Sequence, residues 1–219
     1  MTAQSSTLSL WKQHLGHVPD LVWDQARLEV LILADNDLAE LPAQIGQLRH
    51  LRTLDLGHNA LTTVPESLGD LTTLRDFLYL HDNRLAALPA SLGCLAQLRY
   101  LNLSGNAFTQ FPDAVCRMAS LLELRITDNA LQELPPSIAQ LTRLRELHLR
   151  NNRLTGLPAE IGALAELRQL DLRGNPLASL PASLASLPHL EKLDLRWVST
   201  LPPYAWLTAL EAKGCLVYR

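Results

Sequence analysis

The chain has 219 residues, enough for one domain, and a formal net charge of −3 at pH 7. This slightly acidic balance gives no support to nucleic-acid binding through bulk charge. No stretch approaches the length of about 18 consecutive apolar residues that a membrane-spanning helix needs, and the first residues lack the apolar run of a secretory signal. We therefore predict no nucleic-acid partner and no membrane segment.

Residues 8–27 form the first predicted element, a degenerate copy of a pattern that recurs along the chain. Gln13 stands in this copy where the later copies have Asn. Terminal copies of a stacked repeat are usually atypical, because one of their faces meets water. We expect residues 8–27 to cap the N-terminal end of the core, with Trp11 and Trp23 covering it.

Residues 28–189 contain seven copies of the pattern LxxLxLxxNxLxxLPxxIGxLxx. Its Asn recurs every 23 or 24 residues, at Asn36, Asn59, Asn83, Asn106, Asn129, Asn152 and Asn175. The leucine spacing mixes a short strand with a turn and a returning segment, so one coil cannot bury its leucines alone. Stacked coils would share a continuous leucine core, which predicts a solenoid.

The polar and proline positions of the pattern indicate how each coil turns. Each Asn follows a strand, where the chain turns. Its side-chain amide can form hydrogen bonds with backbone N–H and C=O groups of the turn that have no partner in the sheet. We therefore expect a column of buried Asn. The Pro in each copy suits the outer face, because proline lacks a backbone N–H and no neighbouring strand there requires that hydrogen bond. We expect short extended or 3₁₀ segments on that face.

This pattern resembles that of intracellular leucine-rich repeat proteins of the LPxxIGxL type, known in bacterial proteins and in Ras-scaffolding and plant homologues. The resemblance covers nearly the whole chain, residues 1–219, as a single domain. It implies an α/β fold, a right-handed leucine-rich repeat solenoid or horseshoe. A parallel sheet would line the concave face, and short turns the convex face. The repeated residues are structural, so they do not identify a function.

The copy that starts at Leu74 is one residue longer than its neighbours. The extra residue falls near Asp76-Phe77, just before the strand leucines Leu78 and Leu80. A single inserted residue in a strand region is usually accommodated as a bulge. We predict a bulge there, with both leucines still in the core.

Residues 190–219 form a truncated copy followed by a C-terminal cap. The copy opens at Leu190 and lacks its Asn, and Trp206, Leu207 and Leu210 follow at helical spacing before Gly214. Gly is the usual residue just past the end of a helix. We expect the sheet to end near Leu195, and the apolar tail to pack back on the final coil.

The sequence shows no P-loop, GxSxG, HExxH or CxxC motif, and we predict no cofactor. The three cysteines, Cys94, Cys116 and Cys215, have no metal-type spacing, and an unpaired set suits a reducing cytoplasm. His58 and His81 would lie on neighbouring turns and could touch. Two His without a third ligand make a poor metal site, so we predict none.

The strand residues between the leucines point away from the core and form rows along the concave face. Their N-terminal members are small and apolar, the middle has Tyr79, His81 and Tyr100, and the C-terminal half carries mixed charge and ends at Trp197. The candidate partner-binding residues are Tyr79, His81, Tyr100, Asn102, Glu123, Arg125, Glu146, His148, Arg150, Asp171, Arg173, Asp194, Arg196 and Trp197. Two interpretations stay open: a solvated face whose charges pair with each other, or an interface in which Arg and Tyr act as anchors.

These observations favour a non-enzymatic protein-interaction module, a monomer in the cytoplasm that binds a protein on its concave face. A second hypothesis is a target-recognition effector or regulatory subunit of a separate catalytic protein, exported without a classical signal peptide. A third is an enzyme with an unfamiliar site around His148 and Glu146. No nucleophile, base and orienting group stand together in the sequence, which counts against the third.

Overall fold

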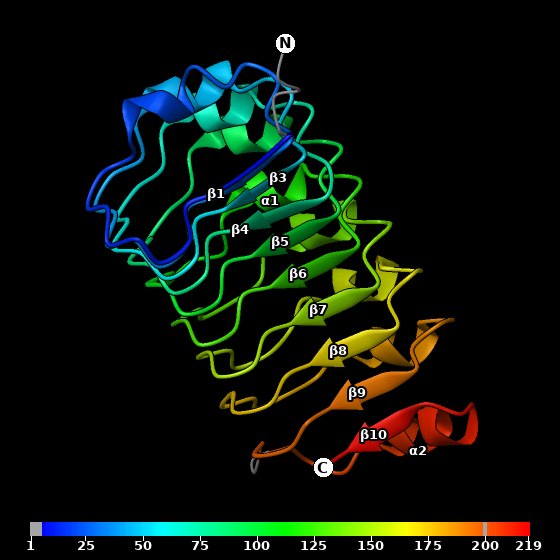
Figure 1. Cartoon of the computed structure of the whole chain (residues 1–219). Coiled ribbons are helices and arrows are strands. Elements are labelled where there is room, and N and C mark those ends of the chain that lie inside the picture. The colour runs from blue at the N-terminus through cyan, green and yellow to red at the C-terminus, as the bar shows by residue number, and fades with distance from the viewer. Residues whose placement is uncertain (1–5, 199–200) are drawn as a thin grey trace.

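The computed structural model describes residues 6–198 and 201–219 and shows one ten-stranded sheet (Figure 1). Every strand is parallel to its neighbours, and the strands follow one another in chain order, as predicted. They are β1 (Thr7–Ser9), β2 (Val30–Ile32), β3 (Thr53–Asp55), β4 (Phe77–Tyr79), β5 (Tyr100–Asn102), β6 (Glu123–Arg125), β7 (Glu146–His148), β8 (Gln169–Asp171), β9 (Lys192–Asp194) and β10 (Leu216–Tyr218).

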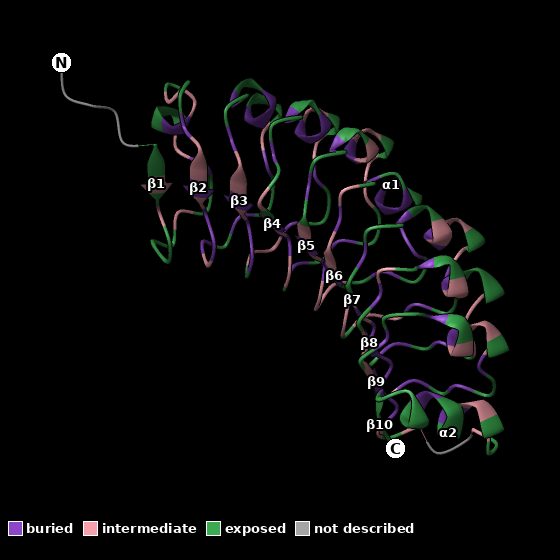
Figure 2. Ribbon diagram, turned by 90° about the vertical axis from the view of Figure 1, so that its right-hand side faces the viewer, coloured by how far each residue is buried: buried purple, intermediate pink, exposed green. Residues whose placement is uncertain are grey.

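Short helices line the outer side of the curve, opposite the strands (Figure 2). The 3₁₀ helices are η1 (Asp20–Val22), η2 (Ala43–Gln47), η3 (Glu66–Asp70), η4 (Ala90–Cys94), η5 (Pro136–Gln140), η6 (Ala159–Ala163) and η7 (Ala182–Ser186). The two α-helices are α1 (Asp113–Cys116) and α2 (Ala205–Ala212). A proline immediately precedes η1 to η7 and α1, for example Pro42 with φ −63° and ψ 148°. Its fixed φ and missing donor fit a helix start.

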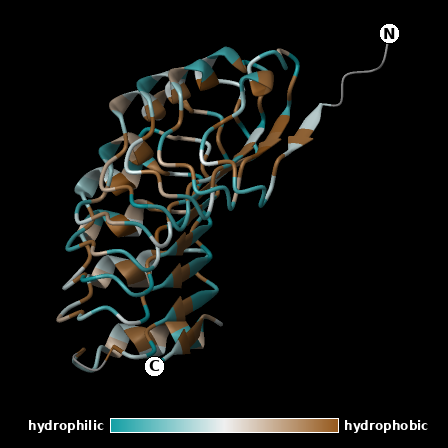
Figure 3. Ribbon diagram, turned by 60° about the vertical axis from the view of Figure 1, so that its left-hand side comes forward, coloured by the Kyte–Doolittle hydropathy of each residue, from teal (hydrophilic) through white to brown (hydrophobic). Residues whose placement is uncertain are grey.

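The core is a continuous stack of leucines contributed by all the coils. In Figure 3 hydrophobic and hydrophilic residues alternate along the coils. The strand leucines, such as Leu78 and Leu101, are fully buried, and so is Phe108. Because each coil covers the leucines of the next, the stability of a coil depends on its neighbours.

The Asn side chains join consecutive coils, as predicted. In Asn152 the amide donates to the carbonyls of Ile126 and Leu149, both at 2.9 Å, and its oxygen accepts the backbone N–H of Leu131 at 3.0 Å. Four members of the column are buried and three are half-buried. The buried members are Asn36, Asn83, Asn152 and Asn175.

The turns that follow β1 to β9 each hold at least one residue in the left-handed region. Asp35, His58, Asp82, Asp128 and Asn151 occupy this position with φ between 50° and 59°. Only glycine adopts such angles freely, and Asn, Asp and His are the side chains that tolerate them best. The backbone therefore favours short polar side chains along this rim of the concave face.

The inserted residue forms a bulge just before β4, as predicted. One residue, Arg52, stands between the buried Leu51 and β3, whereas both Arg75 and Asp76 stand between the buried Leu74 and β4. The backbone N–H groups of Asp76 and Phe77 donate to the carbonyl of Arg52 as in the other coils, but Arg99 donates to the carbonyl of Arg75. Two residues, Arg75 and Asp76, thus occupy the place of one. The core register is kept, because Leu78 is fully buried while Tyr79 is not.

The two ends differ in part from the predictions. Trp11 is 60% exposed, because it follows β1 at a position whose side chain points away from the core; only Trp23 packs against the core. The sheet does not end near Leu195: the chain returns after α2, and β10 pairs in parallel with β9. Tail residues of alternating exposure complete the otherwise unpaired edge of β9.

The predicted single domain over 1–219 includes residues 1–5 and 199–200, which lie outside the described residues. Among the helices of the described part, none is long and apolar enough to cross a membrane.

Candidate functional site: the concave face

The strand register places the candidate residues in rows across the sheet. Tyr79, Asn102, Arg125, His148 and Asp171 are successive partners in one row, which continues to Asp194. A second row runs through Tyr100, Glu123 and Glu146. This row also contains Phe77 and Leu216, which are missing from the sequence-based set.

Three aromatic side chains form a cluster on β4 and β5, here called the aromatic cluster: Phe77, Tyr79 and Tyr100. Their ring centroids lie 5.1 to 5.8 Å apart, and Phe77 and Tyr79 are stacked. Phe77 is 42% exposed, and with the two tyrosines it forms part of a contiguous exposed patch, which is more informative than a single exposed apolar side chain. The bulge before β4 hides Phe77 from a simple repeat alignment, but counting back from Leu78 would have found it.

Both tyrosines of the aromatic cluster keep their protons at neutral pH. Burial raises the pKa of Tyr100 to about 12, against a smaller opposing effect of the Arg125 charge. Burial also raises the pKa of Tyr79. A neutral phenol can donate as well as accept a hydrogen bond, so the aromatic cluster offers apolar contact and polar groups together.

The middle of the face carries contacts between charged or polar side chains two residues apart on one strand. Arg125 pairs with Glu123 on β6, and the His148 ring lies 3.2 Å from the Glu146 carboxylate on β7. The Arg125 guanidinium also lies 5.9 Å from the Tyr100 ring centroid. These pairs hold long side chains in place beside the aromatic cluster.

Two further pairs involve Asp171 on β8 and Asp194 on β9, both of them candidate binding residues, with the arginines that follow these strands. Asp171 and Asp194 are buried, because the following arginines fold over them: Arg173 pairs with Asp171 at 2.6 Å and Arg196 with Asp194 at 2.7 Å. Burial alone would raise the pKa of Asp194, but hydrogen bonds from Arg196 outweigh it, and the pKa is lowered. The arginines present their cationic edges, while the carboxylates are covered.

A hollow of about 380 Å³, here called the basic hollow, opens next to these pairs. Four cationic side chains line it, Arg125, Arg150, Arg173 and Lys192, together with the covered Asp171 and the ring of His148. Arg150 pairs with Asp128 through one terminal nitrogen, but its Nε is buried and has no hydrogen-bond partner within the described residues. Lys192 forms no ion pair with any residue that the structure describes. The hollow therefore retains donors for an anionic group.

The C-terminal end of the face is apolar and exposed. Trp197 is 71% exposed, with the Arg173 guanidinium 5.8 Å from its ring centroid. Leu216 and Tyr218 on β10 are 59% and 41% exposed. Sequence reasoning treated residues 215–218 as a tail packing inward. The short run of apolar, strand-favouring residues 215–218, directly after Gly214, was the available signal for a strand.

Several solved structures resemble this chain. A leucine-rich repeat protein of Leptospira interrogans is 26% identical with a TM-score of 0.75, over 96% of this chain and 64% of that one. The leucine-rich repeat domain of the type III effector XopL is 28% identical with a TM-score of 0.81, over 97% and 75%. The plant peptide hormone receptor RGFR1, solved in complex with RGF2, is 30% identical with a TM-score of 0.77, over 90% and 35%.

The chain thus spans less than two thirds of the Leptospira protein and about a third of the receptor chain. No curated protein matches it at a significant level. A family model described as "Leucine rich repeat" matches residues 26–85 and 142–197, and one described as "Leucine-rich repeat region" matches residues 88–154. With its repeated Asn, its leucine core and its alternation of parallel strands and 3₁₀ turns, the chain belongs to the leucine-rich repeat family.

Proposed function

We propose that the chain is a non-enzymatic protein-interaction module that binds a protein partner on its concave face, between the aromatic cluster and Trp197. The observation that carries this proposal is the position of the aromatic cluster directly beside the basic hollow, on one continuous sheet. Aromatic and Arg side chains supply most of the binding energy in protein interfaces. A curved sheet presents them over a long surface.

The ion pairs favour binding because they hold the arginines before a partner arrives. Arg173 is gripped by Asp171 at 2.6 Å and by Asp194 at 3.5 Å. A side chain that is already ordered loses less entropy on association, which otherwise costs about 0.5–1.5 kcal/mol for each long side chain. The concave face thus offers charged hydrogen-bond donors whose side chains lose little entropy when a partner binds.

The charge of the basic hollow indicates an acidic segment on the partner. Four cations line the hollow; Arg125, Arg150 and Arg173 each pair with a carboxylate, whereas Lys192 has no ion pair within the described residues, and Asp171 and Asp194 are covered. Arg can engage a carboxylate through two parallel hydrogen bonds. Added salt should weaken such a complex, since the pairing groups are partly exposed.

The test is affinity capture from the native cells with two concave variants, Phe77→Ala and Arg125→Glu. Both side chains are substantially exposed, at 42% and 45%, so the fold should survive. Matched changes on the outer side are Leu21→Ala on η1 and Glu160→Arg on η6, both exposed. We expect captured proteins to be lost with the concave variants and kept with the outer ones. Capture unchanged by the concave variants, or lost with the outer ones, would contradict the proposal.

A second candidate function is target recognition within an effector. The similarity to the leucine-rich repeat domain of the type III effector XopL, over 97% of this chain, favours it. The concave face would then select a target for a separate catalytic protein. A secretion assay on the native cells, together with copurification of an enzyme, distinguishes it from a module that stays inside the cell.

A further inference from the structure

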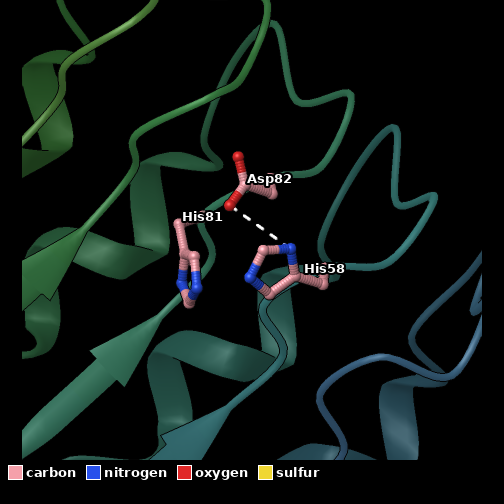
Figure 4. A group of neighbouring side chains, drawn as sticks. All are labelled: His58, His81 and Asp82. Carbon is pink, nitrogen blue, oxygen red and sulfur yellow. Dashed lines mark ion pairs between the residues drawn. The ribbon is translucent and has the colours of Figure 1, made fainter. Parts of the chain in front are cut away.

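Three side chains with metal-ligating atoms meet at the rim of the concave face, where β3 and β4 end (Figure 4). They are His58 from one coil, and His81 and Asp82 from the next. One ligand atom from each lies within 4.8 Å of the others. Nδ1 of His58 is 3.3 Å from the Asp82 carboxylate, and the two imidazole rings lie edge to face with centroids 4.8 Å apart.

Two glycines in the neighbouring coils make room for this group. A Cβ on Gly57 would lie 2.3 Å from Cε1 of His81, and a Cβ on Gly105 would lie 2.1 Å from Oδ1 of Asp82. Both contacts are far too close for any other residue without a shift of the side chains. His58 and Asp82 themselves hold the left-handed turn position of successive coils, so the backbone brings their side chains together.

The group has ligand capacity that the protein does not use. Nδ1 of His81 is buried and has no hydrogen-bond partner among the residues described. A buried, unpaired polar atom is costly and usually finds a partner in a ligand, water or ion.

We propose that His58, His81 and Asp82 bind one divalent transition-metal ion of the Zn²⁺ type. Two imidazoles and a carboxylate are ligands that Zn²⁺ takes at roughly 2.0–2.2 Å, which in a tetrahedron separates the ligand atoms by roughly 3.3–3.6 Å. The His58–Asp82 separation of 3.3 Å already has this value. A modest side-chain movement brings in His81, and water takes the fourth position.

The other polar groups of this kind are less suitable. His14 and Asp37 form a similar pair at 3.1 Å on the first coils, but no second imidazole accompanies them in the described structure. Glu123, Glu146 and His148 also gather within 4.8 Å, but Arg125 already pairs with Glu123. A metal there would have to compete with a guanidinium, whereas no Arg or Lys pairs with Asp82 in the part of the chain that the structure describes.

The experiment is calorimetric titration of the tag-free protein with Zn²⁺, followed by visible absorption spectra with Co²⁺ to report the coordination geometry. We expect one equivalent with a Kd on the order of 1 µM, and a tetrahedral Co²⁺ spectrum. His58→Ala, His81→Ala and Asp82→Asn should each weaken binding by about tenfold or more. Asn tolerates the left-handed angle of residue 82, and circular dichroism checks each fold.

His14→Ala is the matched control, because it removes the imidazole of the similar His–Asp pair and should leave the Zn²⁺ affinity unchanged. The proposal is overturned if the protein binds no Zn²⁺, or if folded His58→Ala and Asp82→Asn bind it as tightly as the parent. It is also overturned if His148→Ala abolishes the binding while His58→Ala does not. None of these results depends on a protein partner, so the outcome is independent of the proposed function.

Discussion

Replacement of Asn152 by Ala tests how the coils are joined. The Asn152 amide donates to the carbonyls of Ile126 and Leu149, and its oxygen accepts the N–H of Leu131. The side chain is only 5% exposed, so water cannot replace these bonds without disturbing the core. Each buried group left unpaired costs about 1–3 kcal/mol, and part of that is recovered by relaxation. We expect a total loss of about 2–4 kcal/mol in the free energy of unfolding.

Urea denaturation followed by circular dichroism measures this loss. With a slope of about 3 kcal/mol per M for a chain of this size, the midpoint should fall by about 1 M. Gln13→Ala is the control, because Gln13 occupies the equivalent place in the first coil but its side chain is exposed. Its effect should stay within about 0.5 kcal/mol. Equal midpoint shifts in the two variants would refute the claim that the Asn column stabilises the stack.

Three further predictions concern packing and charge. Gly69→Ala places a Cβ 2.4 Å from the Ser91 carbonyl oxygen and should cost about 1–3 kcal/mol in urea melts. Gly156→Ala meets the Ser179 hydroxyl at 3.4 Å and its carbonyl oxygen at 3.6 Å, which are ordinary contacts, and should be nearly neutral. Burial raises the pKa of Tyr100 to about 12. The contribution of the neutral phenol to stability is therefore complete below about pH 10 and is lost as the pH rises from there toward about 12. An ultraviolet titration in which Tyr100→Phe removes no late-titrating phenol would disprove this prediction. Asp194 has a lowered pKa, so its contribution to the stability of the fold is present above about pH 4 and is lost on acidification. Asp194→Ala should cost about 1–3 kcal/mol at pH 7, a figure discounted for the partial exposure of Arg196. Urea melts in which the stability difference between this variant and the parent is the same at pH 7 and pH 3 would count against this prediction.

The repeat made most of the fold predictable. Three local features of the repeat each predict one structural element: the Asn spacing, the strand leucines and the Pro that begins each outer turn. They predicted the parallel sheet, the outer 3₁₀ helices and the bulge before Leu78, because one period governs them all. The predicted rows also follow from this period, since side chains alternate along every strand.

Features that depend on contacts between coils, or that depart from the repeat, were not predictable in this way. The exposure of Asp171 depends on the side-chain conformation of Arg173, which folds over it, and the repeat pattern does not predict that conformation. Asp82 was missed as a third ligand beside His58 and His81. Its carboxylate points toward His58 because residue 82 has a left-handed backbone conformation, which the sequence pattern alone does not reveal. The strand over residues 216–218 was missed because it lacks the repeat pattern altogether.

Hydroxyl-radical footprinting tests the proposed concave binding surface most directly. A partner obtained by affinity capture would be added, and the oxidation rate of each exposed side chain measured with and without it. The proposed surface predicts that Phe77 and Trp197, 42% and 71% exposed in the free chain, become protected, while Trp11 at the N-terminal end and Leu21 on the outer side stay reactive. Protection of Trp11 or Leu21 with unchanged oxidation of Phe77 and Trp197 would contradict it.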